Sequence, residues 1–351
     1  MAAGIGPVRF QRLLEVCGGA EAAWHASDSQ LATAGLEHRT AASLKRLRRQ
    51  TTPSAAYDHL RGLGVEAVTL EDAGYPEHLR TIPDPPPVLF VKGRLLPRDH
   101  LAVALVGTRQ ATAYGRAVAL RLGGELATSG VTVVSGMARG IDSVAHRAAL
   151  EAGGRTIGVL ANGLDQVYPP ENTALVERIV SQEAGAVVSE FPPGVPPDAA
   201  NFPRRNRLIA GLSRVTVIVE AGQHSGALIT ADNALEQGRE VMAVPGSILS
   251  ATSAGSNELL KQGAVPVLGV HDILAVLDSP DLSASAGDVA RPMPHVSELE
   301  KRVLEALSGE PLHKNDIARE THARIEDVSV ALTMLEMKGM ARPVGALYTR
   351  S

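Results

Sequence analysis

The sequence has little cysteine, no long apolar run and no excess of one charge, and each of these shortages excludes a class of protein. The single cysteine, Cys17, excludes a disulfide framework and a cluster of thiolate metal ligands, so we expect a thiol in the protein core. No apolar run approaches the roughly 20 residues that a membrane-spanning helix needs. The segment 1–10 lacks the charged and apolar regions of a secretory signal. We therefore expect a cytoplasmic protein without a membrane segment.

Charge and aromatic content limit how the chain could bind a polyanion. Its 34 Lys and Arg residues against 38 Asp and Glu give a net charge of −4, so binding to nucleic acid must come from a local arginine cluster. Only four phenylalanines, one tryptophan and five tyrosines are available for stacking on bases. The 11 histidines show no metal-ligand spacing, and we expect neither a metal nor a cofactor.

Two changes of composition divide the chain. The proline-rich stretch 81–87 excludes helix and interior strand, because each proline lacks a backbone donor and restricts the preceding residue. It separates a helix-like beginning, rich in alanine and arginine, from a large middle part. The stretch 278–295 is rich in Ser, Pro, Ala and Asp without an apolar period, which is typical of a flexible linker. We expect a small helical head, the large middle part and a C-terminal module.

The middle part alternates short apolar runs with segments of helical pattern. The runs lack polar alternation, which is typical of strands buried on both faces of a parallel sheet. This pattern predicts a doubly wound α/β fold, in which ligands bind beyond the carboxyl ends of the strands. The expected strands are 101–107, 131–136, 155–163, 186–190, 214–221, 240–246 and 264–269.

Glycine-rich turns come after three of these strands and point to an anion site. Glycine lets backbone amides approach a ligand closely, and a helix N-terminus favours negative charge. Arginines at two of the turns add donors that match phosphate oxygens. The alternative is that the glycines only permit tight turns between strand and helix. The candidate binding residues here are Gly107, Thr108, Arg109, Ser135, Gly136, Ala138, Arg139, Gly140, Ser225 and Gly226.

Two familiar nucleotide motifs are missing from these turns. The chain has no G-x-x-x-x-G-K-[ST], so nothing indicates a phosphate-loop NTPase. The turn at 107–115 reads GTRQATAYG instead of G-x-G-x-x-G, and no acidic residue comes after the second strand where a ribose ligand would stand. Both observations weaken a dinucleotide-dependent enzyme as an interpretation.

A cluster of arginines beside a phenylalanine lies in the segment 201–213. We expect a helix to begin near Arg204, which would put the arginines in its first turn, where positive charge opposes the helix dipole. Arginines for phosphates next to an aromatic ring for a base favour single-stranded nucleic acid as the ligand. The alternative is an exposed basic helix that pairs with acidic neighbours. The candidates here are Asn201, Phe202, Arg204, Arg205 and Arg207.

Signs of catalysis are weak by comparison. His146 and His224 pair with no nucleophile at a recognisable spacing. Asp142, Glu190 and Glu220 stand at strand or turn ends and could act as acids or bases. We interpret them instead as residues that cap helices and hold the arginines in place.

Taken together, the motifs resemble those of the DprA (Smf) family, the DNA-processing proteins of bacterial natural transformation. The resemblance covers about 65–278. It rests on Y-P-x-x-L-R (75–80), G-T-R (107–109), S-G-x-A-x-G-I-D (135–142), GVLANGLDQVYPPEN (158–172), S-E-F-P (189–192), NFPRRNRLIAGLS (201–213) and SGALITA (225–231).

This resemblance implies an extended Rossmann-like, mostly parallel sheet that binds single-stranded DNA without sequence specificity and without catalysis. It also implies a homodimer that assists loading of the RecA recombinase in transformation and recombination. By the same resemblance Arg109 would hold a phosphate, while Phe202, Arg204, Arg205 and Arg207 would contact DNA. Some relatives carry a lysine three residues before the phenylalanine, where this chain has Ala199.

The flanking parts are similar to further modules of the family. Residues 1–64 resemble part of a helix-hairpin-helix or SAM-like head, and 279–295 would be the linker. Residues 296–351 resemble a winged-helix module, with helices expected near 297–308, 313–321 and 325–339 and a hairpin after them.

One enzyme class stays open as the alternative function. A related Rossmann-like group of phosphoribohydrolases, which process nucleotides, carries P-G-G-x-G-T-x-x-E at the equivalent strand end. This chain reads AGQHSGALIT at 221–230, without the paired glycines or the glutamate. The sequence therefore favours a binding protein.

Overall fold

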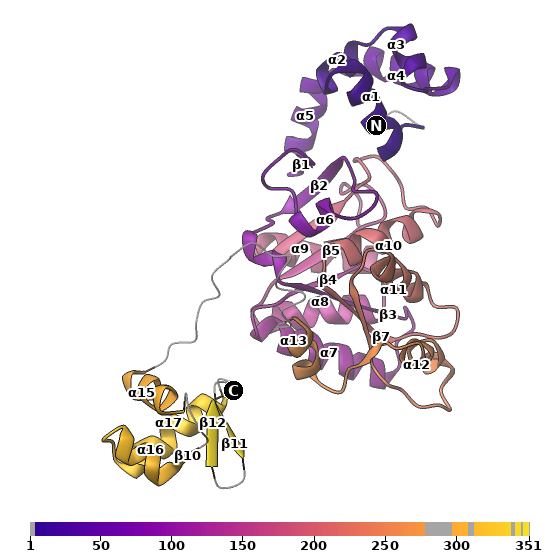
Figure 1. Cartoon of the computed structure of the whole chain (residues 1–351). Helices are drawn as coiled ribbons and strands as arrows, with labels where there is room; N and C mark the ends of the chain where they lie inside the picture. Colours follow the sequence, from indigo (N-terminus) through magenta and orange to yellow (C-terminus); the bar gives the residue numbers. More distant parts are fainter. Residues whose placement is uncertain (1–3, 278–296, 308–311, 338–340, 345–346, 351) are drawn as a thin grey trace. The chain divides into compact units, whose positions relative to one another are not determined.

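The structure is a computed structural model that describes residues 4–277, 297–307, 312–337, 341–344 and 347–350. The chain divides into two compact units, residues 1–285 and 286–351 (Figure 1). None of the helices in these described ranges is long and apolar enough to span a membrane.

The first unit begins with five helices, and the first four of them share a small core of their own, whereas Leu60 of the fifth packs against the core of the sheet. Leu13, Leu31 and Leu44 are buried in the core of the first four helices, and the half-buried Cys17 packs against its edge, so the expected core thiol is only partly enclosed. Thr52 caps the last of the five helices by accepting a hydrogen bond from the amide of Ala55. The helices are α1 (Pro7–Cys17), α2 (Ala20–His25), α3 (Asp28–Thr33), α4 (His38–Gln50) and α5 (Pro53–Gly62).

A nine-stranded sheet comes next, in the order β1-β2-β6-β5-β4-β3-β7-β8-β9. Strands β3 to β9 pair in parallel, whereas β1 and β2 form an antiparallel edge against β6. The strands are β1 (Glu66–Thr69), β2 (Val88–Gly93), β3 (Ala102–Gly107), β4 (Thr132–Ser135), β5 (Thr156–Val159), β6 (Gly185–Ser189), β7 (Val215–Glu220), β8 (Glu240–Ala243) and β9 (Val265–Pro266).

Helices cover both faces of this sheet. Side chains of α7, α8 and α13 bury one face together with Leu105 and Val217, and side chains of α10 and α11 bury the other together with Val106 and Ile218. The remaining helical segments connect strands. The bounds are α6 (Glu77–Arg80), η1 (Pro97–His100), α7 (Ala113–Thr128), α8 (Ile141–Glu151), η2 (Pro170–Asn172), α9 (Thr173–Ser181), α10 (Asn201–Gly211), α11 (Gly226–Glu236), η3 (Ala251–Ser253), α12 (Ala254–Lys261) and α13 (Val270–Leu277).

The predicted fold class is confirmed, because each of the seven apolar runs overlaps a strand of the sheet. The division at the proline-rich stretch 81–87 is wrong, since β1 before the stretch pairs with β2 after it. Neither strand is among those predicted from the sequence. The two strands pair antiparallel, and both are less uniformly buried than the parallel strands. β1 begins with an exposed glutamate and β2 ends in two half-buried residues, so neither resembles a fully buried run.

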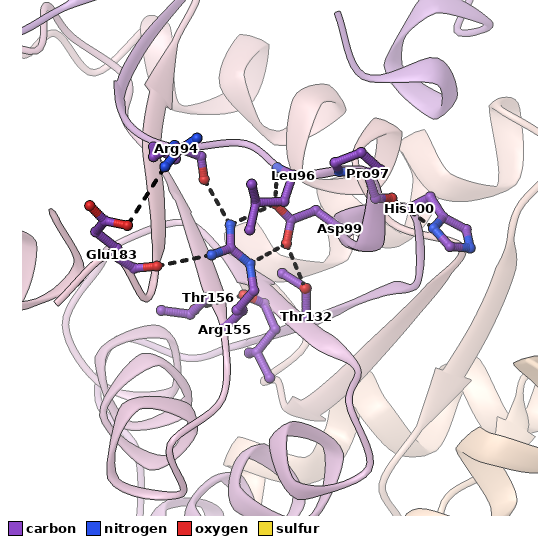
Figure 2. Close-up of polar contacts among 10 residues, drawn as sticks. Arg94, Leu96, Pro97, Asp99, His100, Thr132, Arg155, Thr156 and Glu183 are labelled. Carbon is purple, nitrogen blue, oxygen red and sulfur yellow. Dashed lines mark hydrogen bonds and ion pairs between the residues drawn. The ribbon is translucent and has the colours of Figure 1, made fainter. Parts of the chain in front are cut away.

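A buried ion pair between Arg155 and Asp99 connects chain segments at the end of the sheet where the parallel strands begin (Figure 2). The guanidinium of Arg155, just before β5, donates to both carboxylate oxygens of Asp99 at 2.7 and 2.8 Å, and both side chains are only 7% exposed. Arg155 also donates to the carbonyl oxygens of Glu183 and Arg94, and Thr132 donates to Asp99. This network joins the segments that precede β3, β4, β5 and β6.

The second unit is the winged helix. It contains α15 (Glu298–Ala306), α16 (Lys314–Glu320) and α17 (Ile325–Met337), with a three-stranded antiparallel sheet in the order β10-β12-β11. The strands are β10 (Leu312–His313), β11 (Ala341–Val344) and β12 (Leu347–Arg350), so the expected hairpin is present. The expected linker, 279–295, lies outside the described residues.

Candidate nucleic-acid interface

An open pocket with a volume of about 710 Å³ lies beyond the carboxyl ends of β3, β4 and β7. Strand β3 lies between β4 and β7. The strands β4 to β6 extend the sheet on one side of β3 and β7 to β9 extend it on the other, so the strand order reverses at this point. Such a switch point is the usual ligand position in a doubly wound sheet. The turn after β3, the amino ends of α10 and α11, and Tyr168 contribute to the pocket wall.

The turn after β3 holds Arg109 at the pocket. The amide of Thr108 donates to the carbonyl oxygen of Glu220 at 2.7 Å, which joins the ends of β3 and β7. Gly140, which precedes α8, has φ +76°, and a Cβ there would collide with the carbonyl oxygens of Thr108 and Arg109. A Cβ on Gly107 would come within 2.6 Å of Ile141. Both glycines are therefore needed for the close packing of the two turns.

Phe202 is the centre of a cluster of ring contacts in this pocket. The guanidinium carbon of the exposed Arg109 lies 4.8 Å from the centre of the Phe202 ring, within range of a cation–π interaction. The ring of Tyr168 lies 5.8 Å from that of Phe202 at an angle of 53°. The pocket thus combines a solvent-exposed cation with two aromatic rings.

Arg205 is buried in the pocket wall, with only 3% of its surface exposed. Its guanidinium donates to the carbonyl oxygens of Gly136 and Val159. Burial lowers the pKa of Arg205 to about 10, although the charge of Asp142 acts in the opposite direction. Arg205 therefore stays charged at neutral pH, beside the carboxyl group of Asp142 in the same pocket wall. A Cβ on Gly136 would come within 2.8 Å of both Arg205 and Asp142, so glycine is required there.

The other two arginines of this helix do not line the pocket. Helix α10 begins at Asn201, three residues earlier than expected, and the pocket is lined by Phe202, Arg205, Asn206 and Ile209 at helical spacing. Arg207 is buried away from this face, where it pairs with Glu190 and Asp84 at 2.9 Å each. The exposed Arg204 lies over the ring of Phe191 and 3.8 Å from Glu190.

The remaining predicted residues line the pocket, line a smaller hollow beside it, or line neither. Gly107, Thr108, Ala138, Ser225 and Gly226 line the pocket with Arg109, Phe202 and Arg205, while Gly136 and Arg139 line a smaller hollow of about 40 Å³ beside Phe202. Ser135 is fully buried and donates to the carbonyl oxygen of Leu105 at 2.6 Å, which is a structural position. Asn201 begins α10, and Gly140 supports the neighbouring turn, so neither lines a pocket.

Several residues of the pocket wall are not among those predicted from the sequence. Asn206 could have been found, because it lies four residues after Phe202 and so on the same helical face. Tyr168 carries no such signal, since a long connection after β5 brings it to Phe202. Gln110 and Thr230 also line the pocket, one from the turn after β3 and the other from α11 after β7.

The acidic residues at the strand ends act as supports, as the sequence indicated. Asp142 accepts hydrogen bonds from the amides of Gly136 and Ala138, and burial raises its pKa against the influence of Arg205. Glu220 accepts from the amide and hydroxyl of Thr112, the residue that caps α7. Burial lowers the pKa of His146 to about 3, so its ring is neutral. The described residues contain no group of three or more His, Cys, Asp or Glu that could hold a metal ion.

Comparison with known proteins places this geometry in a family. A family model described as DNA recombination-mediator protein A matches residues 66–278, and the DprA winged helix domain matches residues 288–346. Protein Smf from Synechocystis sp. is 34% identical over 99% of this chain and 96% of its own length. Protein Smf from Escherichia coli is 41% identical over 79% of this chain and 75% of its own.

Two solved structures agree with this assignment. DNA processing protein A from Streptococcus pneumoniae is 34% identical, with a TM-score of 0.66 over 78% of this chain and 94% of that one. The protein of the same name from Helicobacter pylori, whose structure concerns its single-stranded DNA binding mode, is 32% identical. Its TM-score is 0.54 over 60% of this chain and 95% of that one. Family models match the sheet and the winged helix, and one relative matches almost the whole chain, so this chain belongs to the DprA (Smf) family of DNA processing proteins.

Proposed function

We propose that this protein binds single-stranded DNA in the pocket at the ends of β3 and β7, without sequence specificity and without catalysis. The observation that carries the proposal is the position of Arg109 and Arg205 around the exposed pocket that Phe202 and Tyr168 line. Arginine supplies paired donors for phosphate, and an aromatic ring accepts any base on its face. The Helicobacter pylori relative, which has a single-stranded DNA binding mode, supports this choice of ligand.

Absence of catalysis is the second part of the proposal. Asp142 and Glu220 are each engaged in hydrogen bonds that hold backbone turns, and Glu190 pairs with Arg207. A general acid or base must reach the reacting group. These carboxylates serve instead as supports for the pocket, in agreement with a binding protein and against the alternative phosphoribohydrolase function.

The proposed partners of this protein are the RecA recombinase and a second copy of the chain. The family description, DNA recombination-mediator protein A, supports a role in loading the RecA recombinase onto the bound strand in the cytoplasm. One pocket covers only a few nucleotides, so we propose that two copies of the chain act together, which raises the effective concentration of the second site. Sedimentation at micromolar concentration is expected to give a homodimer. A monomer that binds long strands with full affinity would contradict this.

Matched oligonucleotides test the choice of ligand. We expect tighter binding to a single strand than to a duplex of equal length, because a base that is paired inside a duplex cannot reach Phe202. Few phosphates are neutralised, so log affinity should fall with log salt at a slope of about −2 to −3, near 0.7 per phosphate. Binding titrations at several salt concentrations measure both quantities. Tighter binding to the duplex would overturn the proposal.

A further inference from the structure

An ion pair lies at the small hollow beside the Phe202 ring. Arg139 and Glu171 are joined at 2.5 Å, and both side chains are largely exposed, at 62% and 59%. Arg139 lines the small hollow that Arg109, Tyr168 and Phe202 also line. The Arg139 guanidinium is therefore adjacent to the pocket, but it is paired with the Glu171 carboxylate.

The position of Glu171 is fixed by the segment that carries it. Asn172, the next residue, is buried, and its side-chain amide donates to the carbonyl oxygen of Met137 at 2.7 Å. This bond ties the segment to the turn that contains Arg139. The same segment places Tyr168 against Phe202. The short segment 168–172 therefore contains both Tyr168, an aromatic residue of the pocket wall, and Glu171, the carboxylate that pairs with Arg139.

An exchange of this carboxylate for a phosphate is energetically easy. An ion pair between two exposed side chains contributes only about 0–1 kcal/mol to stability, because water screens it. Arginine forms a charge-assisted, bidentate contact with a phosphate as readily as with a carboxylate. A strand whose base lies at Phe202 would bring a neighbouring phosphate close to Arg139, since both line the same hollow.

We propose that Arg139 is a second phosphate site of the bound strand and that Glu171 is an internal competitor which occupies it in the free protein. The proposal rests on the function proposed above. Glu171 accordingly lowers the affinity for DNA. When a strand binds, the phosphate takes the place of the Glu171 carboxylate on the Arg139 guanidinium.

Four variants of the full chain test this exchange with a labelled thymidine oligonucleotide. Glu171→Gln is expected to tighten binding by about three- to five-fold, and Arg139→Gln to weaken it by a similar factor. Arg139→Gln should also reduce the salt slope by about 0.7, the share of one phosphate on a single strand. The double variant should bind like Arg139→Gln alone. Glu177→Gln, which removes an exposed glutamate of α9 outside both hollows, is the control and should change affinity less than about two-fold.

The outcomes separate this inference from the proposed function. If Glu171→Gln leaves affinity unchanged, or if its gain persists in the Arg139→Gln background, Glu171 does not act through Arg139 and the inference is overturned. Arg109→Ala in the same titration checks the pocket itself. A loss of affinity there with no effect of Glu171→Gln would remove only the second phosphate site, whereas no effect of Arg109→Ala would remove the proposed function.

Discussion

Replacing Arg109 with alanine is expected to weaken binding of single-stranded DNA by about 1.5–3 kcal/mol, the cost of losing a charge-assisted contact. Arg109 is exposed at the turn after β3, and its guanidinium lies over the Phe202 ring. This side chain is not buried in the core, so the folded structure should persist without it. Binding titrations with a single-stranded oligonucleotide measure the loss, and thermal melts of the same samples measure stability.

The matched control for this variant is Arg121→Ala. Arg121 is an exposed arginine of α7 that pairs with Glu125 one turn away, outside the pocket. Its loss should leave DNA affinity almost unchanged. Normal binding by Arg109→Ala, or a loss that results only from melting, would show that Arg109 is a structural residue.

Replacing Arg155 with methionine is expected to lower the free energy of unfolding by about 3–5 kcal/mol, because the charge of Asp99 would stay buried without its partner. Figure 2 shows that the same guanidinium also reaches the carbonyl oxygens of Arg94 and Glu183, which would lose their donor. Urea unfolding measured by circular dichroism gives the change. This ion pair lies at the edge of the sheet where the parallel strands begin, so the variant tests the scaffold separately from the pocket.

Two further variants show whether the buried charge is the cause. Asp99→Asn in the Arg155→Met background removes the unpaired charge and should recover part of the lost stability. Arg98→Met changes an exposed arginine of the neighbouring η1 turn and should have an effect within about 0.5 kcal/mol. Equal losses for Arg98→Met and Arg155→Met would mean that the Asp99 pair does not hold this edge together.

The core of the sheet could be predicted from the sequence because its strands are buried on both faces. Seven apolar runs without polar alternation predicted the parallel strands, and the rule that ligands bind at their carboxyl ends led to Arg109. The antiparallel strands β1 and β2 could not be found in this way, because they are less uniformly buried.

The arrangement within the pocket was harder to predict. Arg204, Arg205 and Arg207 look alike in the sequence, and only the rotation of α10 against the sheet separates them. Arg205 is buried beside Phe202, while Arg207 pairs with Glu190 on another side. Tyr168 reaches the pocket through the connection after β5, and contacts across such a distance in sequence have no periodic signal.

Cross-linking locates the bound strand most directly. A thymidine oligonucleotide bound to the full chain would be irradiated with ultraviolet light, and the cross-linked peptides would be identified by mass spectrometry. If the strand lies in the pocket, the cross-links should fall on the peptides that contain Phe202 and Tyr168, whose rings contact each other at its wall. Cross-links confined to the N-terminal helices or to the winged helix, with none at Phe202 or Tyr168, would contradict this account.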